Sequence, residues 1–345
     1  MKRGYMDPNT ELLSDGLLDS RRRSLIKTFD SAGVDAAVIY GDVASADELQ
    51  YFANLGPYWG SATCVLDKDG SRKMVTGMTA RVNFWVSMMS RVPQDDITGA
   101  GPKVNSSLAE YLTGRYPAGA AIGLVGEYFP ERMKTAIEKA GFRTVWMEDT
   151  AESLLDLRDD AYRANLIKGI ELMTAAISEA IRNAADGTRT MIGVAADVEY
   201  ACRKAGAMDA LFLGGEKDLV FGRAAENKSD KPWTLYMQLQ YLGDWMAIAR
   251  NVDAASNEQA FSVRDKVLAG LKPGTIQLYA DVDGWERSVF KQLRSDHLSR
   301  DGSGSAELSP GQVVGVRLRD RKNGVMIEDA VLITDSGARL LTGGC

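Results

Sequence analysis

The chain has 345 residues, of which 45% are hydrophobic and 26% charged, a composition that predicts a globular protein of about two domains. Its 41 Lys and Arg against 47 Asp and Glu give a formal net charge of −6, so it lacks the basic field that attracts nucleic acid or anionic lipid. No apolar run approaches the ~20 residues that span a bilayer, and the first residues carry no apolar signal stretch. We therefore expect a cytoplasmic protein without nucleic-acid or membrane partners.

Cysteine and histidine usage restricts the chemistry further. The three cysteines, Cys64, Cys202 and Cys345, are widely spaced and form no CxxC pair, which favours reduced thiols over a disulfide framework or a zinc site. His297 is the one histidine of the sequence. A zinc ion held by two or three imidazoles of one chain is therefore excluded, and a Ser-His-Asp triad would have to be built around this residue.

Strands alternate with helices over the first 150 residues, after a polar arm over residues 1–20. Apolar runs that end at glycine or in polar turns predict strands, and helical spacing of apolar residues predicts helices. The predicted helices cover residues 21–29, 46–53, 104–115 and 130–140, and the predicted strands cover 34–41, 62–66, 73–77, 121–126 and 144–147. This alternation predicts a compact α/β N-terminal domain over residues 1–152.

A long amphipathic helix is predicted over residues 156–185. Its apolar residues recur every three or four positions, at Leu166, Ile170, Met173, Ile177 and Ile181. Further helices are predicted over 191–205, 257–271 and 282–293, strands over 210–213, 219–221, 234–242, 245–250, 312–319 and 325–334, and a Gly/Ser-rich loop over 295–305. These elements predict an α+β C-terminal domain over residues 153–345, with helices packed on a curved antiparallel sheet.

Motifs near the C-terminus carry a resemblance to a known family. The strand with Ile327-Glu328-Asp329, the preceding Ser309-Pro310-Gly311 and the helix end Lys272-Pro273-Gly274 resemble the creatinase/prolidase/methionine aminopeptidase family. The resemblance extends over nearly the whole chain. It implies the pita-bread fold for residues 153–345, a creatinase-like N-terminal domain, a homodimer, and a pocket on the concave face of the second domain.

The resemblance also implies where a metal site would lie. Most members of the family hold two divalent metals with two aspartates, a histidine and two glutamates, because hard oxygen ligands suit such ions. The matching positions here are Tyr236 and Ala247 for the aspartates, Arg317 for the first glutamate and Glu328 for the second, and the Gly-His-Gly turn of the histidine is absent. Arginine is always cationic and only donates, so we expect no metal ligands, no dinuclear centre and no cofactor.

Creatinase resembles this case because it works without metal and uses a histidine as proton shuttle. The likeness implies a metal-independent hydrolase or lyase that acts on a C–N or C–O bond of a small acidic, amino or aromatic substrate. Arg317 would anchor an acidic group through its fork of donors, and Glu328 would orient it. Tyr236 would donate a proton and His297 would act as base. The other predicted substrate contacts are Phe221, Trp245 and Arg250.

Each of these interpretations has a structural alternative. Arg317 and Glu328 could form a vestigial ion pair that only neutralises a lone carboxylate. The aromatic residues of the 233–245 hairpin could be ordinary packing, and His297 could be an exposed loop residue. The alternative function is a non-catalytic pita-bread protein that binds a ligand or another protein. A true metallopeptidase would require a different alignment of the ligand strands.

Overall fold

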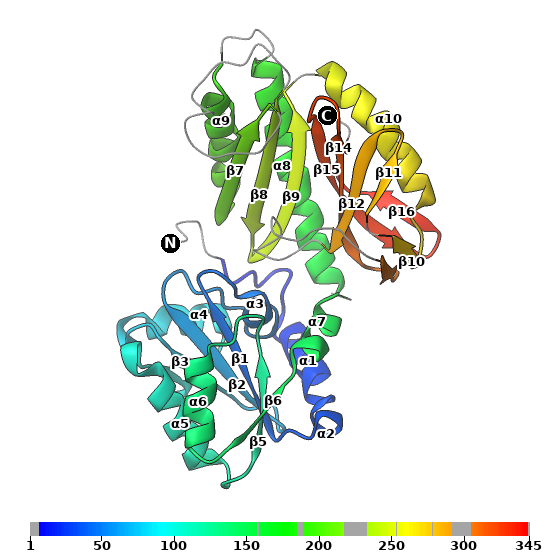
Figure 1. Ribbon diagram of the computed structural model, residues 1–345. Coiled ribbons are helices and arrows are strands. Elements are labelled where there is room, and N and C mark those ends of the chain that lie inside the picture. Colours follow the sequence, from blue (N-terminus) through cyan, green and yellow to red (C-terminus); the bar gives the residue numbers. More distant parts are fainter. Residues whose placement is uncertain are drawn as a thin grey trace. The chain divides into compact units, whose positions relative to one another are not determined.

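The computed structural model describes residues 7–156, 159–184, 189–216, 233–252, 254–277, 279–291 and 305–343. The chain divides into two compact units, Met1–Asp156 and Leu157–Cys345, which are drawn in Figure 1. The sequence placed this boundary after residue 152. Within the described ranges, none of the helices has both the length and the apolar composition needed to cross a bilayer.

The first unit is built on a six-stranded sheet of order β4-β3-β2-β1-β5-β6. Its central strand β1 (Ala36–Asp42) runs parallel to β5 (Ala121–Val125) and antiparallel to β2 (Ser61–Asp67). The other strands are β3 (Arg72–Thr76), β4 (Ile97–Gly99) and β6 (Arg143–Trp146). The helices are α1 (Asp15–Ile26), α2 (Phe29–Ala32), α3 (Asp47–Ala53), α4 (Asn83–Ser90), α5 (Val104–Arg115), α6 (Glu131–Lys139) and α7 (Glu148–Asp156). The predicted α/β N-terminal domain is confirmed.

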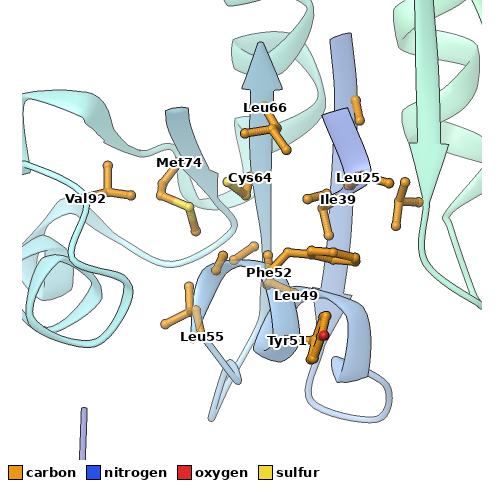
Figure 2. Packing of buried hydrophobic residues seen from close by; sticks show 14 of the residues in the cluster. Leu25, Ile39, Leu49, Tyr51, Phe52, Leu55, Cys64, Leu66, Met74 and Val92 are labelled. Atoms are coloured by element: carbon orange, nitrogen blue, oxygen red, sulfur yellow. The ribbon is translucent and has the colours of Figure 1, made fainter. Parts of the chain in front are cut away.

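Both faces of this sheet are buried, which explains the continuous apolar run of β1. Ile39 packs with Phe52 of α3 and Met74 of β3 in the cluster that Figure 2 shows. The neighbouring Val38 points to the other face and packs in a second cluster with residues of α5 and α6. A strand covered on both sides reads as uninterrupted hydrophobic sequence rather than as alternation.

The two cysteines within the described ranges are buried and should be inert. Cys64 is 1% exposed and Cys202 is 0% exposed, and burial raises the pKa of Cys64 to about 11 and that of Cys202 to about 12. Because the thiolate is the reactive form, we expect iodoacetamide at pH 8 to alkylate neither residue in the folded protein and both in urea. Peptide mass spectrometry measures this, and modification of either residue before unfolding would contradict the structure.

The same raised pKa values make the stability of the fold decrease at alkaline pH. In the unfolded chain the thiols lose their protons near the ordinary cysteine pKa of about 8.5, whereas the folded thiols keep theirs to higher pH. The native state then binds more protons than the unfolded state, so the free energy of unfolding falls as the pH rises through this window.

The second unit is an eight-stranded antiparallel sheet of order β11-β12-β14-β15-β9-β8-β7, with β16 added beside β15. Its strands are β7 (Asp209–Gly215), β8 (Thr234–Tyr241), β9 (Asp244–Asn251), β11 (Tyr279–Val282), β12 (Trp285–Lys291), β14 (Val313–Asp320), β15 (Met326–Thr334) and β16 (Gly337–Leu340). A separate ribbon pairs β10 (Gly274–Gln277) with β13 (Ser305–Leu308). The predicted C-terminal domain with helices on an antiparallel sheet is confirmed.

Helices cover one face of the large sheet. α8 (Asp160–Ala184) and α9 (Met191–Lys204) pack on β7, β8 and β9, and α10 (Ala254–Gly270) packs beside β9, β15 and β16 (Figure 1). Alternate residues such as Met237, Ile248 and Ile327 point to these helices. The opposite face, which carries Tyr236, Ala249, Glu328 and Arg317, is called the inner face below.

The helix predicted over residues 282–293 is wrong. Over its described residues 282–291 the segment forms the turn of the β11–β12 hairpin and strand β12, and the turn residues Asp283 and Gly284 have φ values of 55° and 83°. Asp-Gly is a favoured pair for the two-residue turn that requires positive φ at both positions. The buried Trp285 and Val289 then alternate with residues of the inner face, so the period is that of a strand.

The prediction of a polar arm over residues 1–20 is also wrong from residue 15 onward. α1 begins at Asp15, where the Ser14 side chain accepts a hydrogen bond from the backbone N–H of Leu17 and caps the helix. The predicted strand 219–221 with Phe221, and residues 295–304 of the predicted loop with His297, lie outside the described residues.

Candidate functional site

Four neighbouring strands bring three of the predicted site residues into one row across the inner face. Tyr236 of β8 is the Cα partner of Ala249 in β9, and Ala249 is the partner of Glu328 in β15. Glu328 is in turn the partner of Arg317 in β14. Residues paired in this way point to the same face of a sheet. The structure therefore brings together Tyr236, Glu328 and Arg317, which are up to 92 residues apart in sequence.

An ion pair joins two members of this row. The Arg317 Nε donates to Glu328 Oε2 at 2.7 Å, and Glu328 has no exposed surface while the Arg317 side chain is 18% exposed. Burial alone would lower the pKa of Arg317, but the Glu328 carboxylate and the Tyr236 phenol outweigh it, so the pKa is raised. Arg317 is thus a permanent cation, and it is the part of the pair that reaches the surface.

Aromatic rings flank the guanidinium group. Its carbon lies 4.6 Å from the ring centroid of Phe290 in β12 and 5.5 Å from that of Tyr236. Such contacts favour a cation and lie on the faces of the guanidinium group, not in the plane of its donors. The sequence missed Phe290 because its strand was predicted to be a helix, and the Asp283-Gly284 turn was the signal that could have found it.

The Tyr236 hydroxyl lies buried in this environment. Within the described ranges, neither it nor the Nη2 of Arg317 makes a hydrogen bond of ordinary geometry, although each group is close enough to shift the pKa of the other. Burial, together with the negative charge of Glu328, raises the pKa of Tyr236 far above its usual value. The phenol therefore stays protonated and can serve as a donor, not as a base.

The other predicted residues lie away from this row. Trp245 pairs with Gln240 of β8, four residues along β9 from Ala249, which at ~3.3 Å per residue is about 13 Å. Trp233 and Tyr241 pack against the helices in the cluster with α8 and α9. Of the aromatic residues in this hairpin, Tyr236 is the one that joins Arg317 and Glu328.

Arg250 lies on the helix-covered face, opposite to Glu328. It is completely buried, forms an ion pair with Asp329, and donates from Nη1 to the carbonyl oxygens of Ala249 and Glu328 at 2.8 and 2.9 Å. Asp329 also accepts from Thr342 and, at 3.5 Å, from Arg264. A molecule on the inner face cannot reach Arg250 in this position. Its side chain instead ties β9 to β15 directly behind the row.

The residues at the four positions that the family resemblance matches to metal ligands do not fit a pair of divalent metals. Of the four matching positions, only Glu328 carries a carboxylate, and that carboxylate is bound to a guanidinium group. Tyr236 is held in its neutral form, and Ala247 has no ligand atom in its side chain. Within the described ranges, no group of three or more His, Cys, Asp and Glu side chains is placed to hold a metal. A cationic arginine among these positions opposes a second cation.

Comparison with solved structures shows the fold to be a known one. The chain superimposes on a Xaa-Pro dipeptidase from Bacillus anthracis with a TM-score of 0.72 and 16% identity, over 95% of this chain and 98% of the other. For an X-Pro aminopeptidase from Thermotoga maritima the TM-score is 0.74 and the identity 16%, over 93% of this chain and 97% of the other. For a prolidase from Pyrococcus horikoshii the TM-score is 0.69 and the identity 15%, over 94% of this chain and 99% of the other. A scan against family models and a search of curated sequences find no match.

Proposed function

We propose that this chain, which has the pita-bread fold of prolidases and X-Pro aminopeptidases, is a metal-independent hydrolase or lyase that acts on a small organic acid. The observation that carries the proposal is the Arg317–Glu328 ion pair at 2.7 Å, on strands where the fold's relatives are expected to place metal ligands. An arginine whose side chain is partly exposed and held in a fixed orientation is suited to bind a carboxylate.

Each charged or polar residue of the row would have its own role in the reaction. Arg317 would bind the acidic group of the substrate while Glu328 holds its side chain in place. Tyr236 would protonate the nitrogen or oxygen that leaves when the C–N or C–O bond breaks. Because its hydroxyl is fully buried, binding has to shift Arg317 or Tyr236 before this proton can move. His297 would take the proton from water or from the substrate carbon.

A thermal-shift screen of amino and aromatic acids tests the binding step. We expect a carboxylate that binds the wild type to lose at least about tenfold in affinity in Arg317→Lys, since lysine keeps the charge but not the fork of donors. Arg339→Lys is the matched control because Arg339 is an exposed arginine of the same unit. Equal affinity in all three proteins would show that Arg317 does not anchor the acid.

A non-catalytic binding protein is the second candidate, and one observation favours it. Tyr236 is protonated, Arg317 is cationic and Glu328 is paired, so the row binds an anion but contains no free base. The enzyme proposal therefore depends on His297. Turnover of a bound acid that is lost in His297→Ala supports the enzyme, whereas binding without turnover in the wild type supports the binding protein.

We further propose that the protein is a homodimer, as its resemblance implies. Light scattering on the purified protein tests this, with an expected mass of twice the 37.5 kDa of one chain.

A further inference from the structure

A second group of arginines lies in the first unit, between α1 and the start of β3. Arg21 and Arg22 of α1 reach the last turn of α3, where Arg21 Nη1 donates to the Tyr51 carbonyl at 3.3 Å and Arg22 Nε donates to that of Phe52 at 2.8 Å. These carbonyls lack partners within their helix, and cations at a helix C-terminus are favourable. This contact gives the Nε of Arg22 an acceptor, but not the two terminal nitrogens of its guanidinium group.

Among the residues that the structure describes, one donor of Arg22 has no partner. Arg22 is 4% exposed, and its Nη1 donates to Asp19 at 2.7 Å, while its Nη2 is buried without a hydrogen bond. A buried donor of this kind costs free energy unless a water or an ion satisfies it. The unused Nη2 therefore marks a place where an acceptor is missing.

Arg72 brings a second positive charge to the same place. It is the Cα partner of Leu66 in β2, so it points to the sheet face of Leu66 and Cys64, on which Leu25 of α1 packs (Figure 2). The Arg72 side chain makes no hydrogen bond or ion pair within the described part of the chain. Its charge lowers the pKa of Arg22, which burial has already lowered, to about 10. Two guanidinium groups therefore repel each other here.

The nearby carboxylates are already engaged. Asp15 accepts from Arg91 Nη1 at 2.7 Å, and Asp19 accepts from Arg22 Nη1 at the same distance. Both carboxylates are mainly exposed, at 80% and 54%. Neither gives Arg22 Nη2 a hydrogen bond, and neither forms an ion pair with Arg72 among the described residues, although the Arg91 hydrogen bond and, added to it, the charges of Arg22 and Arg72 lower the pKa of Asp15.

We propose that Arg22 and Arg72 bind a small oxyanion, a phosphate or carboxylate group, at the junction of α1 and β3. Arginine forks suit either group, because both present two oxygens at the spacing of the guanidinium donors. The oxyanion would accept from Arg22 Nη2 and stand between the two like charges. This site belongs to the first unit and does not depend on the chemistry proposed for the inner face.

Thermal unfolding of the full chain tests the site. Melting temperatures are compared in sodium phosphate, sodium acetate and sodium chloride at equal ionic strength, for the wild type and for Arg72→Gln. We expect phosphate or acetate to raise the wild-type melting temperature above its value in chloride, and the affinity to fall at least about tenfold in Arg72→Gln. The anion with the larger shift identifies the preferred group.

Arg72→Gln should itself fold well, because Arg72 is only partly buried and makes no bond to the described residues that is lost. In chloride we expect it to be as stable as the wild type or more stable, since the repulsion of Arg22 is removed. Arg132→Gln, at an exposed arginine of α6, is the matched control and should keep the anion effect. Equal shifts in all three proteins would mean adventitious surface binding, and that result, or no shift in the wild type, would overturn the proposal.

Discussion

Asp329→Asn is expected to lower the free energy of unfolding by about 3–5 kcal/mol, the usual cost of removing one partner of a buried ion pair. The carboxylate of Asp329 is completely buried and is shared by Arg250, Arg264 and Thr342. Without its charge, the fully buried Arg250 loses the counter-ion that the structure gives it. Urea denaturation followed by circular dichroism measures the loss.

Asp265→Asn is the matched control for this prediction. Asp265 also pairs with Arg264, at 3.0 Å, but its side chain is 66% exposed. Exposed ion pairs contribute about 0–1 kcal/mol, so this variant should unfold almost as the wild type does. If both variants lost the same free energy, the buried cluster behind β15 would not have the role that we assign to it.

Arg317→Met is expected to destabilise the protein more than Glu328→Gln does. Loss of the arginine leaves Glu328 as a charge without exposed surface, at a cost of about 3–5 kcal/mol. Loss of the glutamate leaves Arg317, whose side chain is partly exposed and keeps some hydration. The double variant should recover much of the loss, because it leaves neither charge unpaired. Urea denaturation of the three variants measures the coupling between the two residues.

The loss in Arg317→Met should also depend on pH. A buried carboxylate that loses its arginine takes up a proton more readily, so the pKa of Glu328 in this variant rises above its value in the unfolded chain. The native state then binds more protons than the unfolded state, and its stability falls as the pH rises. We therefore expect Arg317→Met to be closer to the wild type at pH 5 than at pH 8. The same deficit at both pH values would contradict this account.

The sequence allowed much of the fold to be predicted where its signals are local. The three-to-four spacing that includes Leu166 and Ile170 predicted the long helix, and the Ile327-Glu328-Asp329 strand led to the C-terminal sheet. The helix predicted over 282–293 was wrong because the apolar residues of this segment fit both periods, and the Asp283-Gly284 turn is the signal that decides between them. In that case the information was present in the sequence.

The site was harder to predict because β9 and β15 are neighbours in space but not in sequence. The family resemblance brought Tyr236, Arg317 and Glu328 to one surface. It did not show that Arg250 points to the opposite face, which follows from its contact with Asp329. Likewise, nothing in the sequence joins Arg22 of a helix to Arg72 at the start of a distant strand. Such contacts depend on the order of strands and on the packing of helices, which local patterns do not fix.

Titration of metal-stripped protein with Mn²⁺ in a calorimeter tests the central claim most directly. Since Arg317 already neutralises Glu328, we predict no saturable, stoichiometric binding in the wild type. Uptake of one or two ions per chain that is abolished by Glu328→Gln would contradict the account, because it would mean that this carboxylate exchanges its arginine for a metal.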